Sequence, residues 1–93
     1  MRESAIEKAF TEAVKQAGGL ALKITPAGLA GFPDRLVIFR GAHIGFVELK
    51  QRGQKPTPIQ ARRHQLLHDF GFTVITLDNT HDIQDTIHAI QAA

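Results

Sequence analysis

Apolar positions recur at helical spacing in the first and last parts of the chain. Over residues 3–17 they fall on one stripe, at about 100° per residue, with charged side chains opposite. Gly18-Gly19 ends this predicted helix, and Asn79-Thr80 caps a second one near the end of the chain. The apolar stripes consist of Ile6, Phe10, Ala13, Val14 and Ala17 in the first helix and Ile83, Ile87 and Ile90 in the last.

Four shorter segments have the patterns of β-strands. In the first, Leu20, Leu22 and Ile24 alternate with smaller or polar residues, and we expect these three on the buried face. Gly41-Ala42 supplies a hairpin turn between the second and third strands. The fourth is almost entirely apolar or β-branched, which predicts a central strand. The predicted strands span residues 20–25, 34–40, 43–50 and 72–77.

A third helix is predicted between the last two strands. Thr57 suits the N-cap, Pro58 the first turn, and Gln60 the last position of a capping box, while Gly71 ends the helix. Its expected buried stripe consists of Ile59, Leu66, Leu67 and Phe70.

The resulting order is α-β-β-β-α-β-α, which predicts a single α/β domain over residues 1–93 with a mixed sheet flanked by helices. A domain of this size has a thin core, so a partner subunit would stabilise it. The chain has no Cys, which excludes disulfides and thiolate metal sites and favours a reducing cytoplasm. The longest unbroken aliphatic or aromatic run, Leu36 to Phe39, excludes a membrane span and a signal peptide.

Charge is distributed unevenly along the chain, although the net charge is only +2. No acidic residue occurs between Leu49 and His68, and no Lys or Arg follows His64. An acid-free basic block suggests an anionic partner such as nucleic acid, or simply a solvated loop and helix face. The bases of this block are Lys50, Arg52, Lys55, Arg62 and Arg63.

The third strand breaks the apolar pattern. Glu48 and Lys50 share its face with Ile44 and Phe46, because successive side chains alternate. That face is expected to be buried, and a buried carboxylate requires a partner such as a cation or a hydrogen bond.

Asp34 is expected to join this group from the second strand. A short hairpin at residues 40–43 pairs positions whose numbers sum to about 83–84. Asp34 then lies opposite residues 49–50, beside Glu48.

Two carboxylates about 4 Å apart repel by roughly 4 kcal/mol at an effective dielectric constant near 20. A proton, the lysine or a divalent cation would offset this repulsion, and carboxylate oxygens favour Mg²⁺ or Mn²⁺. A cross-strand ion pair is the alternative.

Three further polar residues lie where they could reach this cluster. Glu7 borders the apolar stripe of the first helix, or is a surface residue at the helix N-terminus. Gln60 borders the stripe of the middle helix, or serves only the capping box. Lys23 lies on the polar side of the first strand, or protects a sheet edge.

Together these residues resemble a known nuclease pattern. Pro33-Asp34, followed after a hairpin by Glu48-Leu49-Lys50, has the form of the PD-(D/E)XK signature. The ordered set resembles more narrowly the virus-type replication-repair nuclease (VRR-NUC) domain, over roughly residues 3–77. The matching elements are Glu7, Gly18-Gly19-Leu20-Ala21-Leu22-Lys23, Gly31-Phe32-Pro33-Asp34-Arg35, Phe46-Val47-Glu48-Leu49-Lys50 and Pro58-Ile59-Gln60.

The resemblance implies a restriction-endonuclease-like core and a Mg²⁺- or Mn²⁺-dependent DNA endonuclease. It implies that Asp34, Glu48 and the Leu49 carbonyl bind the metal and that Lys50 positions water or steadies the transition state. Glu7, with Glu3 as its alternative, would support the metal or its waters, and Gln60 would orient a catalytic group. The residues expected to hold DNA are Lys23, Arg35, Arg52, Lys55, Arg62 and Arg63.

The resemblance also implies a homodimer that cuts branched DNA, such as a Holliday junction or flap, in replication, recombination or repair. We expect it in the cytoplasm of a bacterial or phage-infected cell, with no membrane partner. The alternatives are a branched-DNA-binding module that does not cut and a small oligomerisation domain.

The histidines and one loop remain outside this assignment. His64 and His68 lie four residues apart, but a zinc protease would need Glu where Gln65 stands, so we expect them on an exposed or DNA-facing flank. Leu29 and Phe32 are apolar residues in a Gly-rich loop. They are expected in a dimer interface, at a DNA branch, or in the core.

Overall fold

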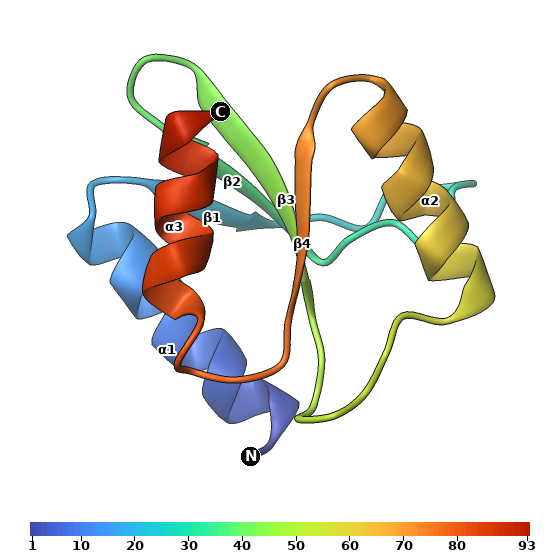
Figure 1. Cartoon of the computed structure of the whole chain (residues 1–93), viewed down its shortest axis with the longest axis horizontal. Helices are drawn as coiled ribbons and strands as arrows, with labels where there is room; N and C mark the ends of the chain where they lie inside the picture. Colours follow the sequence, from blue (N-terminus) through green and yellow to red (C-terminus); the bar gives the residue numbers. More distant parts are fainter.

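A computed structural model describes residues 1–93, and its elements follow the predicted order. The four strands form one mixed sheet in the order β1-β2-β3-β4; β2 pairs antiparallel with β1 and with β3, and β3 pairs parallel with β4. Helices α1 and α3 lie on one side of the sheet and α2 on the other (Figure 1). The elements are α1 (Glu3–Gln16), β1 (Leu20–Lys23), β2 (Arg35–Phe39), β3 (His43–Leu49), α2 (Pro58–Asp69), β4 (Thr73–Leu77) and α3 (Ile83–Ala92).

The hairpin between β2 and β3 has a different register from the expected one. Phe39 pairs with His43, so three residues form the turn, and two of them have positive φ: Gly41 at 85° and Ala42 at 61°. Arg35 consequently pairs with Val47, and the preceding residue, Asp34, lies beside Glu48 itself. The longer turn therefore brings the two carboxylates more directly together than predicted.

The main core lies between the sheet and the helix pair α1 and α3. The seam of α3 is confirmed as buried, and that of α1 is buried at its three large residues, whereas Ala13 is partly buried and Ala17, at the C-cap, is exposed. The expectation for β1 is wrong: Ala21 packs against the core, whereas Leu20 is 59% and Leu22 42% exposed. The reason is that α1 approaches β1 closely enough for a small residue, while nothing covers its other face. The core contains Ile6, Phe10, Val14, Val37, Phe39, Val47, Leu49, Leu77, Ile83, Ile87 and Ile90.

The second face of the sheet carries Phe46 and Glu48 beneath α2. The Phe46 ring meets Phe32 and Phe72 edge to face, with ring centroids 5.6 and 5.4 Å apart. These contacts hold the loop of residues 26–33 against the sheet. Phe32 is therefore in core contact, while Leu29 of the same loop is exposed.

Helix α2 does not bury the predicted apolar stripe. Of that stripe only Leu67 is buried, and Phe70 is 69% exposed. The capping box at Thr57 and Gln60 is confirmed, but the helix is rotated so that polar side chains face the sheet. This rotation positions the polar groups next to Glu48. The side chains turned inward are Gln60, Arg63, His64 and Leu67, whereas Ile59, Leu66 and Phe70 are exposed.

Strand β4 lies at an edge of the sheet, which corrects the prediction of a central strand. Its apolar composition has a different cause, because α2 contacts one side of it and α3 the other. None of the helices combines the length and apolar character needed to cross a membrane.

Candidate active site

The two acidic residues of the predicted motif meet at the open end of the β2–β3 hairpin. The backbone N–H of Leu49 donates to Asp34 Oδ2 at 2.8 Å. Asp34 is partly exposed, whereas Glu48 is only 2% exposed. Glu48 therefore lies at the buried base of the site and Asp34 at its rim. The Lys50 N–H, just past the strand, donates to the Leu77 carbonyl and continues the parallel pairing.

The pKa of Glu48 is raised from 4.5 to about 8. Burial is the largest cause, the charge of Asp34 and a hydrogen bond between the two carboxyl groups act in the same direction, and Lys50 opposes them. Glu48 Oε1 has no hydrogen-bond partner. A buried acid held in this way loses its proton readily only when a positive charge arrives.

Lys50 and Gln60 both approach the other oxygen of Glu48. Lys50 Nζ lies 3.9 Å and Gln60 Nε2 3.4 Å from Oε2. The Gln60 Oε1 atom meanwhile accepts a hydrogen bond from the Thr57 N–H at 2.9 Å. The capping box of Gln60 is confirmed, and the same side chain also contacts Glu48, so one residue begins α2 and joins it to the buried carboxylate.

His64 is a site residue that sequence reasoning missed. Its Nε2 atom lies 3.7 Å from Glu48 Oε1, and its side chain is 13% exposed rather than on an open flank. Burial, and then the charge of Lys50, lower the pKa of His64. The available signal was its spacing, because His64 follows Gln60 by four residues and so lies one turn along the same helix face.

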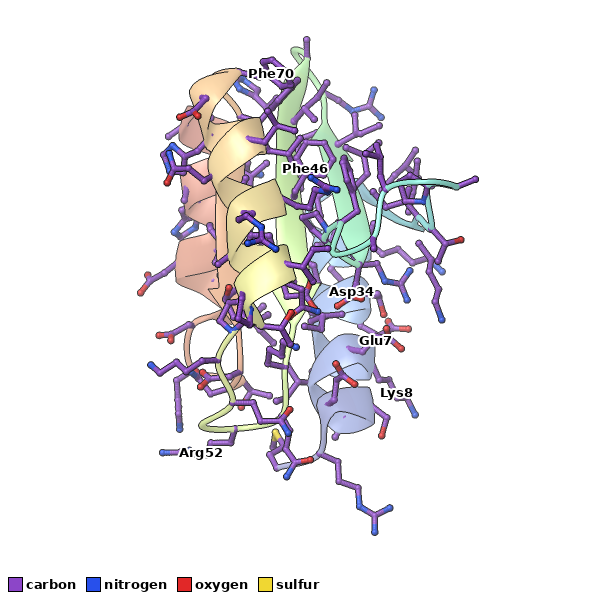
Figure 2. All side chains as sticks on the ribbon, turned by 90° about the vertical axis from the view of Figure 1, so that its right-hand side faces the viewer. Glu7, Lys8, Asp34, Phe46, Arg52 and Phe70 are labelled. Carbon is purple, nitrogen blue, oxygen red and sulfur yellow. The ribbon has the colours of Figure 1, made fainter.

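Helix α1 places Glu7 on the side of the molecule that carries Asp34 (Figure 2). Glu7 Oε2 lies 3.4 Å from Arg35 Nη2, while Arg35 Nη1 donates to the Ala21 carbonyl at 3.0 Å. Glu3, one turn earlier, is among the charges that raise the pKa of Glu48. Of the two predicted helix carboxylates, Glu3 therefore acts on the charge of Glu48, and Glu7 pairs with the arginine that follows Asp34.

The carboxylates fit a divalent cation only with help from other oxygen donors. No group of three His, Asp or Glu side chains is arranged to hold a metal ion by itself. Asp34 and Glu48 would supply oxygen ligands, and Glu48 Oε1 has no other partner. A cation there would complete its coordination with a backbone carbonyl and water, the arrangement Mg²⁺ commonly uses.

The predicted DNA-binding residues do not all occupy open surface. Arg35 is held by Glu7 and Ala21, and Arg63 Nε donates to the Ala30 carbonyl at 3.0 Å. The exposed members are Lys23, Arg52, Lys55 and Arg62.

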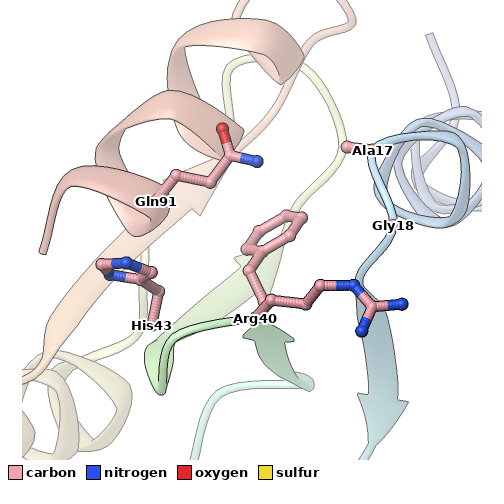
Figure 3. Close-up of a pocket in the computed structure, with 6 residues that line it drawn as sticks. Ala17, Gly18, Arg40, His43 and Gln91 are labelled. Carbon is pink, nitrogen blue, oxygen red and sulfur yellow. The ribbon is translucent and has the colours of Figure 1, made fainter.

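Two shallow pockets lie at opposite ends of the sheet. One, of about 240 Å³, has Asp34, Leu29 and Phe32 in its wall and adjoins the carboxylates. The other, of about 230 Å³, is lined by Arg40, His43 and Gln91 and lies beside the hairpin turn, away from Glu48 (Figure 3). Only the first belongs to the site.

Asp34 and the sequence Glu48-Leu49-Lys50, joined across one hairpin of a mixed sheet, define the PD-(D/E)XK class of nucleases. Among solved structures, one described as "VRR_NUC domain" superposes with a TM-score of 0.86 at 32% identity, over 92% of this chain and 94% of that one. A second, "VRR_NUC domain protein", has a TM-score of 0.74 at 19% identity, over 97% and 88%, and shows the fold alone.

A curated relative agrees with the structural comparison. "Putative nuclease p44" of Acyrthosiphon pisum secondary endosymbiont phage 1 is 42% identical over 90 residues, 97% of this chain and 96% of that protein. No family model matches the sequence. The chain belongs to the VRR-NUC family of nucleases, as its motif predicted.

Proposed function

We propose that this protein is a Mg²⁺- or Mn²⁺-dependent DNA endonuclease that hydrolyses phosphodiester bonds in branched DNA. The observation that carries the proposal is Glu48, a buried carboxylate with one unpartnered oxygen, beside Asp34 and facing Lys50. Such a group is unfavourable without a counter-charge and well suited to binding one.

Each residue has a role that its position supports. Asp34, Glu48 and the Leu49 carbonyl would hold the cation, which supplies Lewis-acid activation of water and phosphate. Lys50 holds the attacking water or neutralises charge that develops on the phosphate oxygens. Gln60 fixes the carboxylate of Glu48, and Glu7, with Glu3 as the alternative, receives hydrogen bonds from water at the rim.

The basic block continues from this site. Arg52, Lys55 and Arg62 are exposed on the loop and first turns that follow β3. These side chains would contact phosphates beside the reacting one, with Lys23 at the end of β1. A DNA substrate is consistent with work in the cytoplasm of a bacterial or phage-infected cell, in replication, recombination or repair.

We propose further that the protein is a homodimer. Strand β1 and the flank of α2 leave apolar residues uncovered on the same side of the sheet, since Leu20 and Leu22 share the face of Phe46 by their pairing with Ile38 and Leu36. Exposed apolar side chains gathered on one side of a small domain mark a surface for association. This outer apolar face consists of Leu20, Leu22, Ile59, Leu66, Phe70 and Phe72.

Cleavage of defined DNAs tests the activity and its selectivity. The protein is incubated with a four-way junction, a flap, a splayed arm and plain duplex, in Mg²⁺, Mn²⁺ or EDTA. We expect metal-dependent cutting of the branched substrates that Glu48→Ala abolishes. Undiminished cutting by a folded Glu48→Ala protein would overturn the assignment.

A branched-DNA-binding module without catalysis is the second candidate. It predicts junction binding by the wild type with no cutting in either metal. The presence of Asp34, Glu48 and Lys50 together favours the enzyme, because binding alone does not need this buried charged set.

A further inference from the structure

We infer that His64 is a positioning residue that holds the metal-binding carboxylate of Glu48 in a single orientation, acting with Gln60 as a two-point clamp from α2. This inference rests on the proposed function, because it deepens the role of the same site. It gives a role to a histidine that is neither part of the nuclease signature nor one of the Lys and Arg residues of the basic block.

The first observation is that two partnerless atoms face each other. Three buried side-chain nitrogen or oxygen atoms lack a hydrogen-bond partner: Arg35 Nε, Glu48 Oε1 and His64 Nε2. The last two lie 3.7 Å apart. Burying a polar atom without a partner costs about 1–3 kcal/mol. A shift of a few tenths of an ångström would pair both atoms and leave Oε1 a second lone pair for the cation.

The second observation is how the donors are divided. Gln60 Nε2 approaches Glu48 Oε2 at 3.4 Å, and His64 Nε2 approaches Oε1. Gln60 and His64 lie one helical turn apart, so both project from the same face of α2. A carboxylate with a separate donor at each oxygen cannot rotate about its terminal bond without losing one of them.

The capping box and one further contact fix the part of α2 that carries Gln60 and His64. Gln60 also accepts from Thr57 at the N-cap, and Arg63 joins α2 to the loop at Ala30. The helix is therefore fixed near the site at its beginning, and His64 follows within the next turn. Residues that orient metal-binding carboxylates typically change metal affinity or activity by about 10–100-fold when removed.

Thermal unfolding across a MnCl₂ titration provides the test. His64→Leu and His64→Asn place no donor at the Nε2 position, and we expect their apparent Mn²⁺ affinity to fall about tenfold. His64→Gln carries an amide nitrogen close to that position and is expected to stay within about threefold of the wild type. His68→Leu, on an exposed turn of the same helix, is the matched control. Melting in EDTA establishes that each variant is folded. If His64→Leu does not fold, His64→Asn alone provides the test.

The outcomes separate the two proposals. Reduced affinity in His64→Leu and His64→Asn with rescue by His64→Gln supports the clamp. Unchanged affinity in the first two overturns it while leaving the nuclease assignment intact. A loss in all three variants overturns positioning, and indicates that the imidazole itself binds the ion. Absence of any Mn²⁺ response in the wild type overturns the metal site and the clamp together.

Discussion

The backbone N–H of Leu49 donates a hydrogen bond to Asp34 Oδ2 across the hairpin, with 2.8 Å between the two atoms. This contact joins the two halves of the signature, because Leu49 is the residue between Glu48 and Lys50. It holds one carboxylate against the strand that carries the other.

Replacing Asp34 should separate its structural role from its charge. Asp34→Ala removes the acceptor for Leu49 and is expected to destabilise the protein by about 1–3 kcal/mol. Asp34→Asn keeps an oxygen acceptor and should be destabilised less. Both variants are expected to lose the stabilisation by Mn²⁺. Urea unfolding with MnCl₂ or EDTA measures both effects, and a Mn²⁺ response retained in Asp34→Asn would contradict the ligand assignment.

The raised pKa of Glu48 predicts that metal-free stability falls with increasing pH. The folded protein holds a proton on Glu48 up to about pH 8, whereas the unfolded chain releases it near 4.5. Stability therefore falls as the pH rises through this window. Between pH 7 and 9 the expected loss is about 1 kcal/mol.

Glu48→Gln is expected to remove this part of the pH dependence, because the amide cannot ionise. Urea unfolding in EDTA at pH 7, 8 and 9 compares the two proteins. Parallel curves for wild type and variant would show that Glu48 does not titrate in this range.

The two helix carboxylates can be distinguished by matched substitutions. Glu7 pairs with Arg35, the residue that follows Asp34. We expect Glu7→Gln to lower cleavage about tenfold at limiting Mn²⁺, and Glu3→Gln to lower it less than threefold. Initial rates across a Mn²⁺ series provide the comparison, and the reverse ranking would assign the role to Glu3.

Dimerisation should depend on the outer apolar face. Phe70→Lys and Leu20→Glu each place a charge where the proposed interface excludes water, at a cost of several kcal/mol on association. Sedimentation velocity should show a dimer for the wild type and a monomer for the variants. Leu29→Asp serves as a comparison, because Leu29 lies in the loop beside Asp34. Unchanged mass in both face variants would exclude this interface.

We expect the DNA affinity of the protein to fall with salt, because residues of the basic block would contact phosphates. Substituting Arg52, Lys55 and Arg62 with Gln should lower the slope of log affinity against log salt by about 1 per residue. Junction binding is measured with the Glu48→Ala protein, so that no cutting occurs. Lys15→Gln, at the far end of α1, is the control and should leave the slope unchanged.

Much of the fold could be predicted because local patterns carry it. The seams of α1 and α3, the order of elements and the capping box at Thr57 all depend on neighbouring residues. The hairpin register was harder to predict from the sequence, because a turn of three residues rather than two shifts every cross-strand pair. Asp34 was expected near Glu48, but its position directly beside Glu48 and its hydrogen bond to Leu49 depend on that shift.

The sequence by itself determined the motif residues, their order along the chain and the family to which they belong. Tertiary structure alone decided which face each element buries. The apolar content of α2 pointed to Ile59, Leu66 and Phe70, yet the helix turns Gln60 and His64 toward Glu48 and leaves those three exposed. Hydrophobic periodicity records an average preference for burial, whereas the rotation of a helix follows from all its contacts together. In this protein α2 is rotated so that its polar residues contact the buried Glu48, while Phe46 beneath the helix packs against Phe32 and Phe72. Hydrophobic periodicity does not reveal this rotation.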